Sequence, residues 1–291
     1  MSKTFQEYYE LMTRALKLQG KQEKTSESYL RTLRRVDARI QKPLDELSPE
    51  DLKSYFFELL KTHSWSTVNI DRSSLVFFYT HVLERKWDWI KIVKAPKNKS
   101  IPDILTREEV LVVLSLLRKP AYKTCLTSIY SMGLRLSEAL QISPADICSA
   151  SLRLHVRNSK GNKDRFVPMP HATLILLRKY WWSHKNPNLL FPQFKGNASG
   201  TQEHMHKTGV QTALKAVLLE AGIHKKLSVH SLRHSYATHL VEIGIHLRMI
   251  QELLGHNSPA TTAIYTQISK PVMQNSNQMI HRLMRGLSSL L

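Results

Sequence analysis

Apolar side chains recur at helical spacing through the first part of the chain. Three stripes repeat mainly at intervals of three or four residues. They are Tyr29, Leu30, Leu33, Val36 and Ile40; Leu52, Phe56, Leu59 and Leu60; and Leu75, Phe78, Val82 and Leu83. Ser48 can cap the second stripe, because Pro49 follows it and Asp51 lies three residues on, as in a capping box. This pattern predicts a small domain of four helices.

A break in the periodicity predicts the domain boundary. Pro96 and Pro102 flank a basic, polar stretch between two periodic segments, which is typical of a linker. We therefore predict a helical domain at residues 1–91, a linker at 92–103 and a second, larger domain at 104–291.

The second domain changes its periodicity partway along. It begins with a capping box from Thr106 to Glu109, ahead of an apolar helical face. Residues 152–158 then alternate, residues 159–164 form a turn signal, and residues 165–170 read as a second short strand. Helical periodicity resumes from His171, with residues 191–206 as one long irregular loop. The whole pattern predicts a mainly α fold with a small antiparallel β-hairpin.

Charge narrows the class of partner. The 291 residues carry 42 Lys and Arg against 23 Asp and Glu, a net charge of +19. This excess favours nucleic acid over a membrane surface, since no basic amphipathic stretch or lipidation signal accompanies it. No apolar run suits a signal peptide or approaches the ~18 residues of a spanning helix. Cys125 and Cys148 form neither a metal-type pair nor a disulfide framework, so we expect a cytosolic protein.

One predicted helix groups three residues that suit an anion. His230, Arg233 and His234 lie at positions i, i+3 and i+4, so they share a face. Each also suits an ordinary structural or solvated position, and the triplet alone does not decide. A metal site of His230, His234 and His239 is disfavoured, because the stretch lacks the glutamate of a His-Glu-x-x-His helix and Arg233 opposes a cation. We expect no metal and no cofactor.

Two further pairs allow two interpretations each. Arg135 and Glu138 lie one helical turn apart. They form either a plain ion pair worth ~0.2–0.5 kcal/mol or a unit in which the carboxylate orients the guanidinium toward a phosphate. Lys160 and Lys163 lie on the hairpin turn beside Gly161. They are either solvated or able to donate a proton to a leaving oxygen.

The stretch LLGHNSPATTAIYTQ contains the candidate nucleophile. Gly255 can end one helix, and Ser258 with Pro259 can begin the next. His256 then lies in the turn, and Tyr265 lies about two turns into the following helix. A tyrosine usually packs as an amphipathic side chain, so these residues alone do not establish a reactive phenol.

Taken together, the motifs resemble the tyrosine recombinase (phage integrase) family. GLRLSEAL, SKGNKDRFVP, HSLRHSYATHL, LLGH and AIYTQ occur in that family's order and at roughly its spacings. The resemblance covers about residues 104 to 285, and the first domain resembles the family's core-binding domain. It implies these roles: Arg135 and Arg233 clamp the scissile phosphate, His230 and His256 complete the pocket, Lys160 is the general acid, Glu138 supports the site, and Tyr265 is the nucleophile. His234 is interpreted as structural.

The resemblance also implies a reaction and an assembly. The protein is expected to cut and rejoin double-stranded DNA at specific sites through a 3′-phosphotyrosyl intermediate, with strand exchange via a four-way junction and without metal or ATP. DNA contacts are expected from Lys97, Lys99, Lys163 and Arg165. The active form is expected to be a homo-oligomer, a tetramer on two DNA sites, in the bacterial cytosol or nucleoid. The segment after Tyr265 either packs on its own domain or docks on a neighbouring protomer.

Two alternatives to a recombinase remain open at this point. A relaxing type IB topoisomerase has a similar active site but acts as a monomer without pairing sites. A DNA-binding relative can keep the fold and lose activity. Within the family, Xer-type resolution, integron-like cassette integration and transposon-linked recombination are not separated by the sequence.

Overall fold

A computed structural model describes residues 3–85, 102–159, 163–193 and 198–255, together with residues 262, 263 and 265. The chain divides into two compact units, residues 1–99 and 100–291, and each is described separately. Most of the predicted linker, with Lys97 and Lys99, lies outside the described residues.

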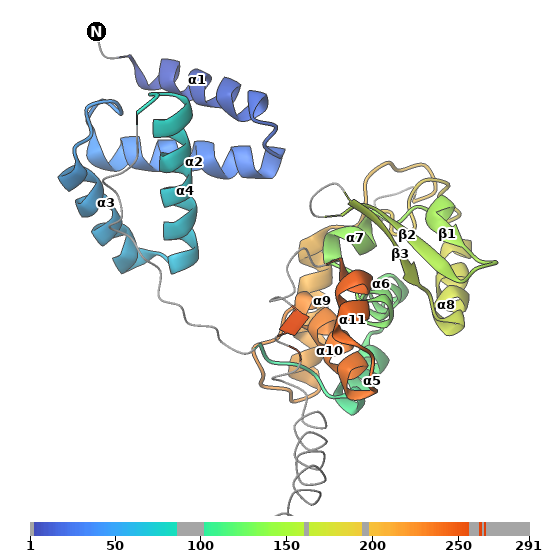
Figure 1. The fold of residues 1–291 in the computed structure, drawn as a ribbon. Helices are drawn as coiled ribbons and strands as arrows, with labels where there is room; N and C mark the ends of the chain where they lie inside the picture. The colour runs from blue at the N-terminus through green and yellow to red at the C-terminus, as the bar shows by residue number, and fades with distance from the viewer. Residues whose placement is uncertain are drawn as a thin grey trace, which may run out of the picture. The chain divides into compact units, whose positions relative to one another are not determined.

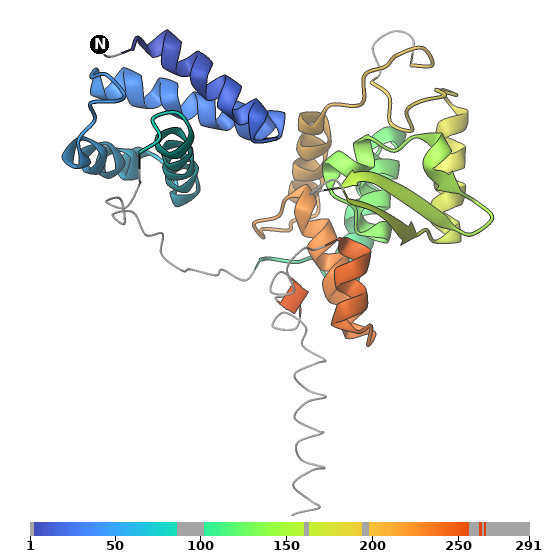
Figure 2. The same cartoon turned by 45° about the horizontal axis from the view of Figure 1, so that its top comes forward.

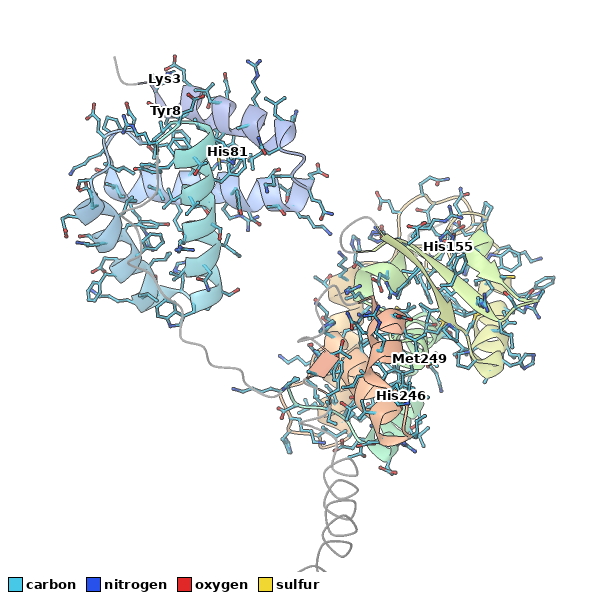
Figure 3. The ribbon with its side chains drawn as sticks, viewed as in Figure 1. Lys3, Tyr8, His81, His155, His246 and Met249 are labelled. Atoms are coloured by element: carbon cyan, nitrogen blue, oxygen red, sulfur yellow. The ribbon has the colours of Figure 1, made fainter. Side chains whose placement is uncertain are left out.

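The first unit consists, over residues 3–85, of the four predicted helices. They are α1 (Phe5–Leu18), α2 (Glu23–Ile40), α3 (Pro49–Thr62) and α4 (Trp65–His81). Figure 1 shows them with α2 and α4 crossing, and Figure 3 places Tyr8 on α1 and His81 at the end of α4. The predicted capping box is present, because Ser48 accepts a hydrogen bond from the backbone of Asp51 and Asp51 bonds back to the backbone of Ser48. Each of the three predicted stripes has buried members, which are Leu33 and Val36; Leu52, Phe56 and Leu59; and Leu75 and Phe78.

A buried carboxylate joins three of these helices. Asp71 of α4 is 1% exposed and accepts a hydrogen bond from Thr32 Oγ1 of α2 at 2.8 Å. Arg35 of α2 donates to both of its oxygens at 2.9 and 2.8 Å, and Tyr55 of α3 donates its hydroxyl proton. A buried carboxylate is tolerated only when its oxygens are satisfied in this way.

The second unit is helical around a small sheet. Its helices are α5 (Arg107–Leu116), α6 (Pro120–Met132), α7 (Leu136–Leu140), α8 (His171–Trp182), α9 (Lys207–Glu220), α10 (Val229–Glu242) and α11 (Leu247–Leu254), with a 3-10 turn η1 (Pro144–Asp146). The buried side chains of α6, among them Leu126 and Ile129, lie in the main core of this unit. Figure 2 shows α10 and α11 together on the side of the unit away from α8. Helix α11 begins after His246 and leaves Met249 exposed (Figure 3).

The sheet is larger than the predicted hairpin by one short strand. Strands β1 (Ile147–Cys148), β2 (Arg153–Ser159) and β3 (Lys163–Pro168) pair antiparallel in that order. The register sets Leu154 opposite Val167, and both are buried. A two-residue strand has no alternation to detect, so β1 could not be predicted from periodicity. The prediction of a mainly α fold with a small antiparallel sheet is otherwise confirmed.

Side-chain hydrogen bonds hold the described part of residues 191–206, the predicted irregular loop. Asn186 donates from its amide to the carbonyls of Ala198 and Thr201, both at 2.9 Å, and Pro192 forms a single β-bridge with His204. Within the described part of the chain, no helix has the length and apolar character needed to span a bilayer.

Candidate active site

The end of α6 and the start of α7 are joined by a turn that needs glycine. Gly133 ends α6 with φ +60°, and a Cβ there would lie 2.6 Å from the ring of Tyr236 and 2.8 Å from Leu254. The left-handed conformation and the lack of space both exclude a side chain. The turn brings Arg135 to the N-cap of α7. Its guanidinium donates to the carbonyl of Gly255 at 3.2 Å, directly after α11, and lies near the start of α10, which carries His230 and Arg233.

Glu138 is the centre of the polar cluster. Its side chain is 6% exposed, and it accepts hydrogen bonds from the backbone N–H and the guanidinium of Arg135 at 2.9 and 2.6 Å. Arg165 donates to both carboxylate oxygens at 3.0 and 2.8 Å, and Arg233 Nη1 lies 3.7 Å away. Burial alone would raise the pKa of the carboxyl, but the hydrogen bonds and charges of Arg165 and Arg135 lower it to about 2. Glu138 is therefore ionised and holds three guanidiniums together.

Arg233 is completely buried. It donates from Nη1 to the carbonyl of Gly133 at 2.7 Å and from Nη2 to the carbonyl of Leu254. Its Nε has no hydrogen-bond partner among the described residues. Burial, and then the charge of Arg135, lower the pKa of this guanidinium to about 9. Such a side chain is strongly stabilised by an anion that approaches it.

Arg165 of β3, predicted to contact DNA, lies mostly within the protein. We expected it to contact DNA, but its side chain is only 9% exposed and its Nε donates to the carbonyl of Leu253 at 3.0 Å. Its two terminal nitrogens bind Glu138. The alternation of β3 directs this residue toward α7 and α11, and the guanidinium lies within the protein as part of the framework of the site.

One of two neighbouring histidines on α10 contacts the tyrosine. The rings of His230 and His234 meet edge to face with centroids 4.6 Å apart. His234 Nδ1 lies 3.1 Å from Tyr265 Oη. Tyr265 is 1% exposed and packs with Ala237 and Leu254. Burial raises the pKa of the phenol, while the charges of Arg233 and Arg135 oppose that shift.

The histidines differ in their surroundings. The ring of His230 is exposed at the rim of the site, yet partial exclusion of water by the neighbouring protein, with the charges of Arg233 and Arg135, lowers its pKa. His234 is half-buried, and burial followed by the charges of His230 and Arg233 lowers its pKa to about 4. His239, the third residue of the disfavoured metal interpretation, has its Nδ1 2.9 Å from Tyr130 Oη. It belongs to a separate pair.

Some predicted residues cannot be placed in the site. Lys160, His256, Lys97 and Lys99, and the side chain of Lys163, lie outside the described residues. The structure brings together Arg135, Glu138, Arg233, His230 and Tyr265, which the motifs had singled out. It adds Arg165 and His234 to that group.

The cluster has the electrostatics of an anion site. The guanidiniums of Arg135, Arg165 and Arg233 surround the single carboxylate of Glu138, which leaves two positive charges in excess at short range. Next to them lie two imidazoles and a buried phenol. The arrangement can bind a phosphate group, stabilise added negative charge on it and present an oxygen nucleophile, as in phosphoryl transfer.

Comparison with known proteins agrees with this chemistry. Residues 104–271 match the Phage integrase family, and residues 8–89 match the family described as Phage integrase, N-terminal SAM-like domain. The tyrosine recombinase XerD of Oceanobacillus iheyensis is 31% identical over 250 residues, which cover 81% of this chain and 83% of that protein.

Solved structures share the fold. The XerH site-specific recombinase bound to a palindromic difH substrate superposes with a TM-score of 0.71 at 20% identity, over 94% of this chain and 85% of that one. A lambda integrase tetramer bound to a Holliday junction superposes with a TM-score of 0.71 at 17% identity, over 89% of this chain and 79% of that one. At these identities the likeness concerns the arrangement of helices and strands.

Proposed function

The chain belongs to the phage integrase family and is a tyrosine site-specific recombinase, and we propose that Tyr265 is the nucleophile with which it cuts DNA. The observation that carries this assignment is the position of the Tyr265 phenol. The phenol oxygen lies 3.1 Å from His234 Nδ1, and the charges of Arg233 and Arg135 act on it. These arginines belong to the cluster that is suited to a phosphate.

The reaction follows from the chemistry of these groups. The phenol attacks the scissile phosphorus, forms a 3′-phosphotyrosyl bond and releases a 5′-hydroxyl, so religation needs no ATP. Arg135 and Arg233 offset the charge that builds up on the non-bridging oxygens in the transition state. Because both guanidiniums are held before DNA arrives, by Glu138 and by the carbonyls of Gly133 and Leu254, little reorganisation is needed.

Two further roles come from the family motifs. Lys160 donates a proton to the departing 5′-oxygen, and His256 with His230 completes the phosphate pocket. The carboxylate of Glu138 binds both Arg135 and Arg165. Glu138 and Arg165 thereby hold the catalytic arginine Arg135 in place.

The protein acts on DNA as an oligomer, and we propose a homotetramer on two DNA sites that exchanges strands pairwise through a four-way junction. The lambda integrase structure is a tetramer on a Holliday junction, and the XerH structure contains its difH substrate. In the proposed assembly both units contact the duplex, with Lys97 and Lys99 on the phosphate backbone and Lys163 beside the active site. The strongly basic charge of the chain supports such contacts.

Relaxation of DNA by a type IB topoisomerase and loss of activity are less well supported. The family match and the XerD relative favour recombination over relaxation. The described catalytic positions Arg135, His230, Arg233 and Tyr265 are filled by the residue types that catalysis needs.

Replacing Tyr265 with Phe tests the nucleophile. Wild-type protein is incubated with sheared DNA from its host and washed in denaturing detergent, so that only covalently attached DNA remains. We expect wild type to retain DNA and Tyr265→Phe to retain none, because the variant lacks only the attacking oxygen. Sequencing of the retained DNA gives the target site.

Tyr236→Phe is the matched control. Tyr236 lies on α10, and its ring packs against Gly133 in the turn between α6 and α7. Removal of its hydroxyl should leave covalent capture intact. Non-covalent binding of both variants, measured by electrophoretic mobility, should equal that of wild type. Covalent capture by Tyr265→Phe at the wild-type level would remove Tyr265 from its assigned role.

A further inference from the structure

His234 makes a contact with the nucleophile that the family motifs do not explain. In HSLRHSYATHL the resemblance uses His230 and Arg233, and we interpreted His234 as structural. Its Nδ1 nevertheless lies 3.1 Å from Tyr265 Oη, within hydrogen-bond distance of the atom that attacks phosphorus. A nucleophile paired with an imidazole at this distance is the geometry of base-assisted attack.

The charged groups around the phenol are poor proton acceptors. The guanidiniums of Arg233 and Arg135 carry only donors and cannot take a proton. Glu138 is ionised, but its oxygens are occupied by Arg135 and Arg165. These contacts hold the pKa of the carboxyl at about 2. Protonating Glu138 would break the contacts that hold the catalytic arginine.

His234 is uncharged when the phenol must lose its proton. Burial and the charges of His230 and Arg233 lower the pKa of its ring, so one ring nitrogen is free of a proton at neutral pH. Among the described residues, the titratable and charged groups that act on it are His230 and Arg233 on its own helix and the phenol of Tyr265. A bound phosphate would offset the nearby positive charge, which favours a protonated imidazole at the moment of attack.

We propose that His234 is a catalytic residue that accepts the phenol proton as Tyr265 attacks the scissile phosphate. The Oη–H bond breaks as the proton passes to Nδ1, and the oxygen forms the phosphotyrosyl bond. The bond from phosphorus to the 5′-oxygen breaks, and that oxygen takes its proton from Lys160. On religation the 5′-hydroxyl attacks, the phenolate leaves and the imidazolium returns its proton to Oη. This role rests on Tyr265 being the nucleophile.

His234→Asn tests the proton transfer itself. The Asn amide places a hydrogen-bonding atom near the position of Nδ1 but cannot take up a proton. We expect single-turnover cleavage to slow by about 100-fold or more, the range of lost general base catalysis. DNA affinity should not change, because the phosphate contacts remain.

The structure offers a matched control on the same helix. His239 Nδ1 lies 2.9 Å from Tyr130 Oη, a second histidine–tyrosine pair that is not part of the phosphate cluster. His239→Asn should therefore cleave within a few-fold of wild type, which separates proton transfer from the general effect of removing an α10 imidazole.

Two chemical substitutions then identify which proton is affected. A ring-fluorinated tyrosine at position 265 has a more acidic phenol, so it should restore most of the rate lost in His234→Asn. A 5′-bridging phosphorothiolate has a leaving group that needs no proton, so it should restore Lys160→Ala and leave His234→Asn slow.

The outcomes are separable. Cleavage by His234→Asn at or above the wild-type rate, or a slow rate that the fluorinated phenol does not restore, would overturn the proposal and leave His234 as a packing residue. Failure of the nucleophile assignment has a different signature, since Tyr265→Phe would then still capture DNA covalently.

Discussion

At the scale of single residues, the site is organised by one carboxylate. Glu138 binds Arg135 and Arg165 and lies 3.7 Å from Arg233. Because the three guanidiniums would otherwise repel one another, removal of the carboxylate affects both stability and catalysis. A broken buried ion pair is costly chiefly through the charge that it leaves without a partner.

Glu138→Gln should lower the free energy of unfolding by about 3 to 5 kcal/mol at pH 7. The pKa of Glu138 is lowered from 4.5 to about 2 in the folded protein. Its ionisation therefore stabilises the fold above about pH 4.5, and this contribution is lost as the pH falls through about 2. Urea unfolding across this range should show a smaller loss of stability with falling pH in Glu138→Gln than in wild type.

Glu252→Gln is the control for this measurement. Glu252 of α11 pairs with Arg248 one turn away, and both side chains are largely exposed. An exposed pair contributes at most about 1 kcal/mol, so this variant should unfold like wild type. Equal destabilisation by the two substitutions would contradict the central role of Glu138.

Sequence spacing predicted the local part of this cluster and missed the rest. Arg135 and Glu138 are three residues apart, so helical geometry alone places them together. The contacts of Arg165 with Glu138 and of Tyr265 with His234 join segments that periodicity treats independently. No pattern within β3 or α10 signals them, since they depend on how the elements pack.

At the scale of elements, the turn between α6 and α7 connects the fold to the site. The carbonyl of Gly133 accepts a hydrogen bond from Arg233, and the same residue starts the turn that leads to Arg135. A distortion here would move both arginines.

Gly133→Ala should therefore reduce stability and cleavage together. The left-handed conformation costs about 1–2 kcal/mol for a residue with a Cβ, and the close contacts with Tyr236 and Leu254 add about 1–3 kcal/mol of overpacking. Thermal unfolding and single-turnover cleavage measure the two effects.

Gly222→Ala separates strain from the loss of space. Gly222 has φ +65°, and among the described residues no atom beyond its chain neighbours lies within 4 Å of the position that a methyl group would take there. Only the conformational cost of about 1–2 kcal/mol therefore applies, and this variant should retain cleavage. If both alanines cost the same stability and activity, the packing of Tyr236 against Gly133 has no special role.

The elements themselves were largely predictable. Capping boxes at Ser48 and Thr106 begin α3 and α5 as predicted, because each cap is a local pair of hydrogen bonds between residues three positions apart. Strand β1 was missed because two residues carry no period; it follows the η1 turn directly and pairs with β2.

At the scale of the whole molecule, charge and motif order were more informative than local pattern. The net charge of +19 predicted a polyanionic partner, and the order of five motifs implied the family that the comparisons then showed. The sequence does not specify the DNA site or the form of the assembly, because both depend on surfaces that contact other molecules.

Duplex binding should weaken steeply with salt, since a protein of charge +19 that contacts several phosphates releases counterions with a logarithmic slope of roughly −0.9 per contact.

Two residues that we predicted to contact DNA are now expected to differ in their effect on this slope. Lys163 is proposed to contact a phosphate, so Lys163→Gln should make the slope shallower by about 0.9. Arg165 is bound to Glu138 and Leu253 within the protein, so Arg165→Gln should leave the slope unchanged while it weakens cleavage. Fluorescence anisotropy between ~50 and ~200 mM salt measures these slopes, with circular dichroism to confirm that each variant is folded. An equal change in slope for both variants would return Arg165 to the DNA-contacting surface, and a flat wild-type dependence would contradict electrostatic binding altogether.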